Sequence, residues 1–448
     1  MSSIVLRNGR LIDPANGIDH IGDLAFLDGL IVPHSGPTSA TVIDCAGCWV
    51  VPGLVDPHVH LRDPGFPHKE TILSGLRAAA AGGFTTVAAM ANTAPVNDCP
   101  EITRYMLAHA QDARAADLVP VSAVTRNLDG RELTGFAAMA AAGARMFSDD
   151  GIPIDDPGLL CSALRAAAAL NLPISLHEED RALTAGGAMN QGPNAERLGV
   201  AGIPAAAESA RVERDLELAR RVDAPVHIAH VSTARSLDLI RAARRGGANV
   251  TCEAAPHHFT LDDTAVLDHG PDARMAPPLR SAGDRAALRA ALADGTIDMI
   301  ASDHAPHDPG SKRMDTLAHF FPHRGPNPLP TDAAQALASA ANGIVGLESA
   351  LGLTLQLVHQ NVIDPARMVK LMSLNPARLL RLDRGALTPG KRADVTVIDP
   401  NLCWTVAPDS FCSLSRNTPF AGLELRGRAV LTIVNGAIVH DARPAERL

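Results

Sequence analysis

The feature that most constrains the fold is an alternation, repeated eight times, of short apolar runs with stretches rich in Ala, Leu and Arg. The apolar runs resemble strands that are buried on both faces, and the stretches between them favour helices. Strands that alternate with helices predict a parallel sheet. Eight such units, with polar residues at nearly every strand end, favour an α/β fold of the (β/α)8 TIM-barrel type over a doubly wound sheet. The predicted strands span residues 50–58, 85–90, 118–124, 144–148, 173–177, 225–230, 248–252 and 297–303.

The two ends of the chain have a different character. Ile4–Leu6 and Leu24–Leu27 are short β-type runs beside Asn-Gly and Asp-Gly turns, and Asp394–Ile398 and Ala429–Val434 repeat this pattern. We therefore expect a small β-sandwich domain formed by both termini, residues 1–50 with 385–448. The barrel, residues 51–384, would then be the catalytic domain.

Polar side chains follow the predicted barrel strands at the points where these strands end. His58 and His60 share one face of the first strand, because side chains alternate with a period of two, so both imidazoles can reach one metal ion. In such a barrel the functional side chains lie at the C-terminal strand ends. The other ends supply Asn92, Asp149, Asp150, His177, His230 and Asp303, with His304 and His307 behind the last.

Each of these residues alone has a structural explanation, since Asp-Asp-Gly is a common turn and a histidine at a strand end is often only hydrogen-bonded. Four histidines and two aspartates on one rim are harder to explain in that way. Imidazole and carboxylate ligands suit zinc and similar divalent ions. Six ligands exceed what one catalytic ion needs, so the pattern favours two ions that share a bridging carboxylate.

Longer motifs carry a family resemblance. Residues 58–65 read HVHLRDPG, residues 92–95 NTAP, residues 148–151 SDDG and residues 301–307 ASDHAPH. These motifs resemble those of the amidohydrolase superfamily and, more narrowly, of class I bacterial dihydroorotases. The similarity continues over nearly the whole chain, through residues 276–280, 343–348, 375–378 and 417–420.

The resemblance assigns roles to individual positions. It implies that His58 and His60 bind a first metal with Asp303, that His177 and His230 bind a second, and that Asp150 rather than Asp149 bridges the two. It also implies a substrate site formed by His60, Arg62, Asn92, His307, Asn342 and Gly343. Arg62, Asn92 and His307 would hold the substrate carboxylate, for which an arginine fork is well shaped.

The activity that the resemblance implies is the reversible cyclisation of N-carbamoyl-L-aspartate to L-dihydroorotate in pyrimidine biosynthesis, with two zinc ions per subunit. In the implied mechanism, a hydroxide that bridges the ions attacks the ring amide, and Asp303 acts as general base. The resemblance also implies a homo-oligomer and leaves open an aspartate transcarbamoylase partner.

Two positions depart from the family pattern. The family usually has a polar residue before the Pro-Pro of the strand 7–8 loop, where this chain has Ala276, so one substrate hydrogen bond is in question. The segment 308–342 is longer than expected, and we weigh an ordered lid over the site against a disordered insertion.

Two alternatives remain from the sequence. A related cyclic amidase, such as an allantoinase or a dihydropyrimidinase, shares the metal ligands but commonly bridges them with a carboxylated lysine. Residues 70–311 contain no lysine, and Arg62 and Asn92 favour a substrate with a carboxylate. The other alternative is an inactive scaffold for aspartate transcarbamoylase, which is disfavoured because all six metal ligands are present.

Composition excludes other classes of protein. The net charge of −9 argues against a nucleic-acid-binding surface, and no apolar run is long enough to cross a bilayer. The seven cysteines are scattered and do not form a disulfide framework. We therefore expect a cytoplasmic enzyme that acts on a small molecule, without a nucleic-acid or membrane partner.

Overall fold

The computed structural model describes residues 3–33, 40–313 and 331–443 of the 448-residue chain. The middle of the chain forms two four-stranded parallel sheets, in the orders β6-β7-β8-β9 and β10-β13-β14-β15. Parallel bridges between Phe147 and Ile174 and between Val59 and His304 join the two sheets at both seams, which confirms the predicted barrel. Its strands are β6 (Leu54–Val59), β7 (Phe84–Ala89), β8 (Asp117–Ser122), β9 (Met146–Phe147), β10 (Ser175–Leu176), β13 (Val226–Ile228), β14 (Val250–Ala254) and β15 (Met299–Ile300).

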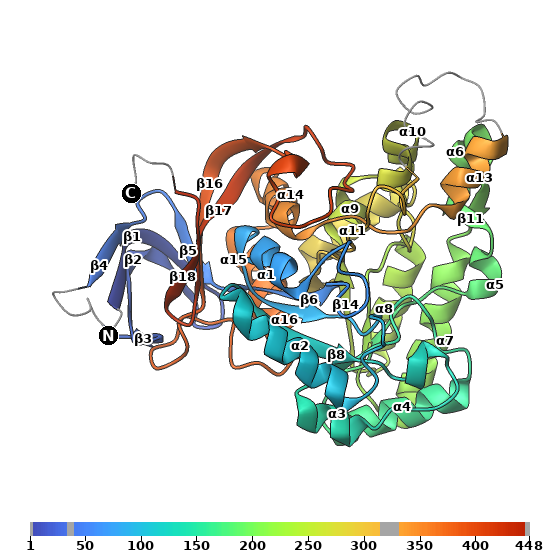
Figure 1. The fold of residues 1–448 in the computed structure, drawn as a ribbon, viewed down its shortest axis with the longest axis horizontal. Coiled ribbons are helices and arrows are strands. Elements are labelled where there is room, and N and C mark those ends of the chain that lie inside the picture. Colours follow the sequence, from blue (N-terminus) through green and yellow to red (C-terminus); the bar gives the residue numbers. More distant parts are fainter. Residues whose placement is uncertain (1–2, 34–39, 314–330, 444–448) are drawn as a thin grey trace.

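Helices follow the barrel strands in the chain and cover the outside of the barrel (Figure 1). The larger ones are α1 (Ile72–Ala81), α2 (Pro100–Ala113), α3 (Phe136–Ala142), α4 (Pro157–Ala169), α7 (Ala206–Val222), α8 (Ala234–Arg245), α11 (Ala282–Asp294) and α14 (Leu347–His359). Shorter elements are inserted in the connections and after the barrel: α5 (Arg181–Thr184), β11 (Gly187–Asn190), α6 (Pro193–Leu198), β12 (Ala201–Ile203), α9 (Pro256–Thr260), α10 (Ala265–His269), α13 (Thr331–Ser339), α15 (Pro365–Val369) and α16 (Asn375–Leu379).

Helix α1 shows how small side chains let the layers approach closely. Thr71 caps the helix by accepting a hydrogen bond from the backbone N–H of Ser74, and the helix then buries Ala78–Ala81. At the end of the helix, a Cβ on Gly82 would lie 2.1 Å from the carbonyl oxygen of Leu347, the first residue of α14. Only glycine fits at this contact, so the packing of α1 against α14 depends on it.

Both termini contribute to one small β domain, on the left in Figure 1. Its strands are connected in a single eight-stranded sheet of order β18-β17-β16-β5-β1-β2-β3, with β4 paired to β1. Side chains from both ends of the chain, including Leu6, Val50, Val395 and Leu431, pack into one core. The strands are β1 (Ser3–Asp13), β2 (Ile18–Leu27), β3 (Leu30–Val32), β4 (Thr41–Asp44), β5 (Trp49–Pro52), β16 (Val395–Thr405), β17 (Glu424–Val434) and β18 (Ala437–Asp441).

The predicted strand 50–58 divides at Gly53. Strand β5 pairs with β1 and β16 in the terminal sheet, whereas β6 pairs with β7 in the barrel. Gly53 lies between them, where a Cβ would be 2.2 Å from the Thr85 hydroxyl oxygen. One apolar run therefore serves two sheets, and a glycine allows the chain to pass from one to the other.

Candidate metal centre

The six predicted metal ligands come together at the C-terminal ends of the barrel strands, and all six are buried. His58 belongs to β6 and His60 follows it, while Asp150, His177, His230 and Asp303 follow β9, β10, β13 and β15. The barrel brings these positions to one edge because all eight strands are parallel. They border or adjoin a cavity of about 290 Å³, which is lined by His60, Arg62, Asn92, Asp150, Gly151, His177, Glu179, His230, Ala276, Asp303, Ala305, His307, Asn342 and Gly343.

Asp150 lies at the centre of this group. Its Oδ1 is 3.4 Å from His58 Nε2, 3.4 Å from His177 Nδ1 and 3.5 Å from His230 Nε2. Its Oδ2 is 3.5 Å from His60 Nε2. Two sets of donor atoms that are close enough to hold an ion therefore share this carboxylate: His58, His60 and Asp150, and Asp150, His177 and His230.

Asp303 approaches the first of these sets from the end of β15, the strand beside β6. Its Oδ1 is 3.4 Å from His60 Nε2 and 3.7 Å from His58 Nε2. Burial alone would raise the pKa of Asp303, but the hydrogen bond with His60 and the nearby histidine charges hold it below its usual range. The same balance of burial against His58, His177 and His230 holds the pKa of Asp150 well below its usual range.

The donor set fits divalent metal ions. His58 Nε2 and Asp150 Oδ1 are buried, and neither has a hydrogen-bond partner among the described residues. A buried polar atom without a partner is costly and calls for an explanation such as an ion. His177 Nδ1 and His230 Nε2 are 2.9 Å apart, close enough to bind one ion together. Imidazole nitrogen and carboxylate oxygen are donors that zinc and related ions accept.

Three residues of the site have a backbone conformation that is uncommon for residues other than glycine. Arg62, His230 and Asp303 have φ angles of +60°, +30° and +49°. Such conformations are strained and persist only where the surrounding structure holds them. Their concentration at one strand edge is typical of a functional site, and no sequence pattern signals it.

The histidines are held by residues that sequence reasoning did not assign to them. His58 Nδ1 lies 2.8 Å from Glu253 Oε1, and His177 Nε2 lies 3.0 Å from Glu179 Oε2. His60 Nδ1 lies 2.8 Å from Asn92 Oδ1, which places the predicted Asn92 beside a metal-ligand candidate. Glu253 could have been found as a polar residue at a strand end, because β14 continues to Ala254 and the predicted strand stopped at Cys252.

Arg62 and His307 line one side of the cavity beside the aspartate and histidine group, with Lys69 in contact with His307. We call this side the cationic wall. Arg62 Nε donates to the carbonyl oxygen of Pro306 at 3.2 Å, and burial lowers the pKa of Arg62 to about 10, so it remains charged. Burial, with the neighbouring Arg62, Lys312 and Lys69 charges, lowers the pKa of His307 to about 2. Lys69 Nζ lies 3.3 Å from His307 Nδ1, so the neutral ring donates from Nε2 to the carbonyl oxygen of Asn342 at 2.8 Å.

Two candidates at strand ends turn away from the cavity. Asp149 accepts hydrogen bonds from the backbone N–H groups of Val124 and Thr125, at 2.7 and 3.0 Å, and so fixes the neighbouring loop. His304 lies against Glu70 at 3.4 Å, and its Nδ1 accepts from the backbone N–H of Gly346 at 3.1 Å. The direction of the side chains thus separates Asp150 from Asp149 and Asp303 from His304.

The two departures from the family pattern can be partly located. Ala276 lines the cavity with a methyl group, so it offers no side-chain hydrogen bond there. Of the segment 308–342, residues 314–330 lie outside the described residues, and α13 begins at Thr331. The lid therefore stays a prediction.

Comparisons with known proteins decide the family. A model of the family described as "Dihydro-orotase-like" matches residues 47–236. A dihydroorotase of Syntrophotalea carbinolica is 45% identical over 440 residues, which cover 98% of this chain and 99% of that protein. The chain belongs to the dihydroorotase family of the amidohydrolase superfamily. A dihydroorotase of Pelobacter propionicus is 43% identical over 442 residues, which again cover 98% of this chain and 99% of that protein.

Solved structures of this superfamily show the same fold. An L-hydantoinase from Arthrobacter aurescens superposes with a TM-score of 0.85 at 26% identity and covers 99% of this chain and 97% of its own. A D-hydantoinase from a Thermus species gives a TM-score of 0.80 at 25% identity, with 98% of this chain and 96% of its own covered. The sequence identity to the dihydroorotases is thus much higher than the identity to the hydantoinases. Dihydroorotases are cyclic amide hydrolases of a metal-dependent superfamily.

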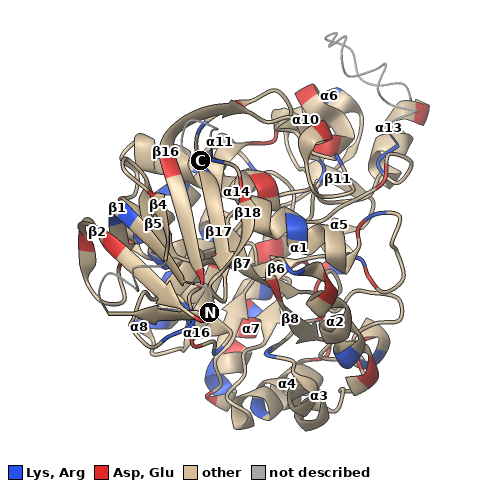
Figure 2. Ribbon diagram, turned by 60° about the vertical axis from the view of Figure 1, so that its left-hand side comes forward, with Lys and Arg blue, Asp and Glu red and all other residues tan. Residues whose placement is uncertain are grey.

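Acidic and basic residues are interspersed along the helices and strands (Figure 2). Within the described residues, no helix is both long and apolar enough to span a membrane.

Proposed function

We propose that this chain catalyses the reversible hydrolysis of L-dihydroorotate to N-carbamoyl-L-aspartate, a step of pyrimidine biosynthesis. The observation that carries the proposal is that Arg62 borders the same cavity as the histidine and aspartate group, in a chain that aligns with dihydroorotases over nearly its whole length. Dihydroorotate has a carboxylate for this guanidinium to bind. Hydantoin and dihydrouracil rings have none.

In this proposal, His58, His60 and Asp303 would hold one ion, His177 and His230 would hold another, and Asp150 would serve both. The nitrogen and oxygen donors support zinc, with two ions per subunit. When bound, such ions supply Lewis-acid chemistry, because they lower the pKa of a water molecule and polarise an amide carbonyl.

Residues on the cationic wall would orient the substrate. Arg62 and His307 lie 3.2 Å apart, and a carboxylate bound to Arg62 would take the Nε2–H that His307 donates to the carbonyl oxygen of Asn342 in the free site. Asn92 uses its Oδ1 to accept from His60, so its amide N–H groups remain available to the ligand. The backbone at Asn342 and Gly343 closes the same side of the cavity. Holding the ring by its carboxylate would keep the amide to be cleaved in a fixed place beside Asp150 and Asp303.

Asp303 would move the proton. As a carboxylate it can accept a proton from the attacking water while the water oxygen bonds to the ring carbonyl carbon. The same proton then moves to the ring nitrogen as the C–N bond breaks, which gives a ureido group and a carboxylic acid. The acid becomes a carboxylate by releasing the second proton of the water to solvent. The reverse sequence closes the ring.

The direct test is turnover of the purified, zinc-reloaded chain on dihydroorotate, allantoin and dihydrouracil, with Asp303→Asn as the inactive control. We expect hydrolysis of dihydroorotate far above that of the other two rings. A higher kcat/KM for allantoin or dihydrouracil would overturn the proposal in favour of a related cyclic amidase.

Three further expectations belong to this proposal. They are a homo-oligomeric assembly, a cytoplasmic location, and activity that does not require an aspartate transcarbamoylase. The two-domain division at residues 51 and 384 likewise stays a prediction.

A further inference from the structure

A buried carboxylate lies on the core side of the candidate metal centre. Glu253, on β14, is only 1% exposed, and its side chain is held between two histidines. Oε1 accepts from His58 Nδ1 at 2.8 Å, and Oε2 accepts from His227 Nε2 at 3.1 Å. Burying a charged carboxylate costs free energy unless hydrogen-bond donors surround it. The two histidines supply such donors to Glu253 in the barrel core.

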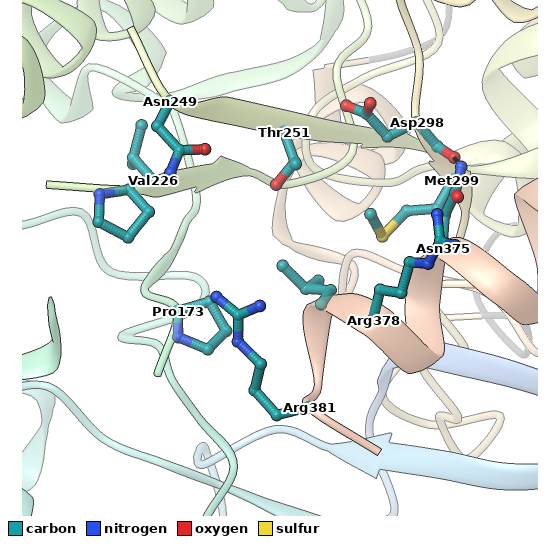
Figure 3. A pocket seen from close by; sticks show the side chains of 11 residues that line it. Pro173, Val226, Asn249, Thr251, Asp298, Met299, Asn375, Arg378 and Arg381 are labelled. Atoms are coloured by element: carbon teal, nitrogen blue, oxygen red, sulfur yellow. Dashed lines mark hydrogen bonds between the residues drawn. The ribbon is translucent and has the colours of Figure 1, made fainter. Parts of the chain in front are cut away.

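The hydrogen bonds continue towards the opposite end of the barrel. His227 Nδ1 lies 2.9 Å from the hydroxyl oxygen of Thr251, which belongs to the same strand as Glu253. Thr251 lines a cavity of about 300 Å³ at the N-terminal ends of the strands, together with Asn249, Arg378 and Arg381 (Figure 3). One chain of hydrogen bonds, from His58 through Glu253 and His227 to Thr251, therefore runs along the barrel interior from the metal centre to this second cavity.

The effect of Glu253 on His58 follows from the chemistry of imidazole. In the neutral form that binds a metal, an imidazole carries one N–H, and because a carboxylate can only accept, Glu253 places this N–H of His58 on Nδ1. Nε2 then has a free lone pair, and it faces Asp150 Oδ1 at 3.4 Å without a hydrogen-bond partner among the described residues. This is the state that a histidine needs in order to bind a metal through Nε2.

His58 differs in this respect from the ligand candidate beside it. His60 rests on the neutral amide oxygen of Asn92, whereas His58 rests on a carboxylate that is itself fixed by a second histidine. We propose that Glu253, held by His227, which in turn contacts Thr251, is a positioning residue that fixes the ring and the tautomer of His58 for metal binding. The inference rests on the proposed metal centre. Glu253, His227 and Thr251 do not line the cavity at that centre, and they belong to none of the sequence motifs.

Two substitutions separate the charge of Glu253 from its reach. Glu253→Gln keeps an acceptor oxygen for His58 but removes the negative charge, and its NH2 forces His227 to accept rather than donate. Glu253→Asp keeps the charge but withdraws it from His58 by one methylene group. Glu70→Gln is the matched control, because Glu70 is equally buried and also contacts a histidine, His304, which faces away from the cavity.

The measurement is zinc affinity, from competition with a chelator of known affinity, on chains whose thermal melting confirms that they are folded. We expect Glu253→Gln to bind zinc about 10- to 100-fold more weakly than the unmodified chain, the range typical of residues that orient metal-bound histidines. Glu253→Asp should change in the same direction, and Glu70→Gln should stay within about twofold. Thr251→Val should show a smaller loss, because it removes only the outermost link.

Unchanged zinc affinity in folded Glu253→Gln, with a melting temperature as low as that of Glu70→Gln, would show that the network serves only to satisfy buried polar groups. If Glu253→Gln does not fold, unchanged affinity in Glu253→Asp would overturn the proposal equally. The result of this zinc-binding test does not depend on which substrate the chain hydrolyses. Weakened zinc binding in a chain that does not hydrolyse dihydroorotate would sustain the role of Glu253 and reject the substrate.

Discussion

Arg62 provides the sharpest test of how the site binds its substrate. Its Nε and one terminal nitrogen already contact Pro306 and His307, which orients the guanidinium towards the cavity and leaves further N–H groups for a ligand. A hydrogen bond to a charged group contributes about 1.5–3 kcal/mol, so loss of a paired contact to a carboxylate should weaken binding by about 3 kcal/mol. At about 1.4 kcal/mol for each factor of ten, Arg62→Met should lower kcat/KM for dihydroorotate by roughly 100-fold.

The assay compares kcat, KM and zinc content for Arg62→Met, Arg62→Lys and Arg426→Met. We expect Arg62→Lys to fall between the unmodified chain and Arg62→Met, because lysine keeps the charge but lacks the planar fork. Arg426 is exposed on the terminal sheet and serves as the control for removal of an arginine. Unchanged kinetics in Arg62→Met, or a loss of activity that only follows loss of zinc, would refute the substrate contact.

Three other predictions address the remaining parts of the site. Asp303→Asn should retain the fold and at least one ion but lose about 10²- to 10⁴-fold in turnover, and near-normal turnover in the metal-loaded variant would exclude it as the base. Asp150→Ala should lose one or both ions by elemental analysis, and reactivation of the stripped, unmodified chain should need zinc but no bicarbonate; a bicarbonate requirement would indicate a carboxylated lysine instead. Lys312 is fully buried and its Nζ donates to the carbonyl oxygens of Arg274, Ala341 and Gly343 at 3.3, 3.0 and 2.9 Å, so Lys312→Met should lower the melting temperature and raise KM with zinc content unchanged. The exposed Lys370→Met is its control, and a KM equal to that of this control would show that Lys312 does not shape the substrate loops.

The barrel could be predicted because its strands are buried on both faces. Such strands appear as continuous apolar runs, and the runs at 85–90 and 118–124 differ from β7 and β8 by only one or two residues. The metal-ligand candidates could be predicted for a related reason. In a parallel barrel, the residues that follow the strands all lie at the same edge. His58, His177 and His230 needed only their positions at strand ends to be placed together.

Other features depend on side-chain direction, which sequence does not reveal. Asp149 and Asp150 are adjacent and chemically identical, so strand position alone did not separate them, and only the family resemblance favoured Asp150. In the structure, the hydrogen bonds of Asp149 with the backbone of Val124 and Thr125 turn it away from the cavity. The break at Gly53 was not foreseen, because residues 49–55 are apolar on both sides of it and the clash with Thr85 arises only in the folded barrel. Glu253 was missed because its strand extends beyond the last residue of the predicted run.

The central claim is that this chain by itself is an active dihydroorotase with a metal centre bridged by Asp150. The most direct measurement is formation of dihydroorotate from N-carbamoyl-L-aspartate by the purified, zinc-reloaded chain, with no transcarbamoylase present. The account predicts ring closure that is abolished by zinc removal, restored by zinc alone and nearly lost in Asp303→Asn. Absence of ring closure with two zinc ions bound, or closure only after an aspartate transcarbamoylase is added, would contradict it.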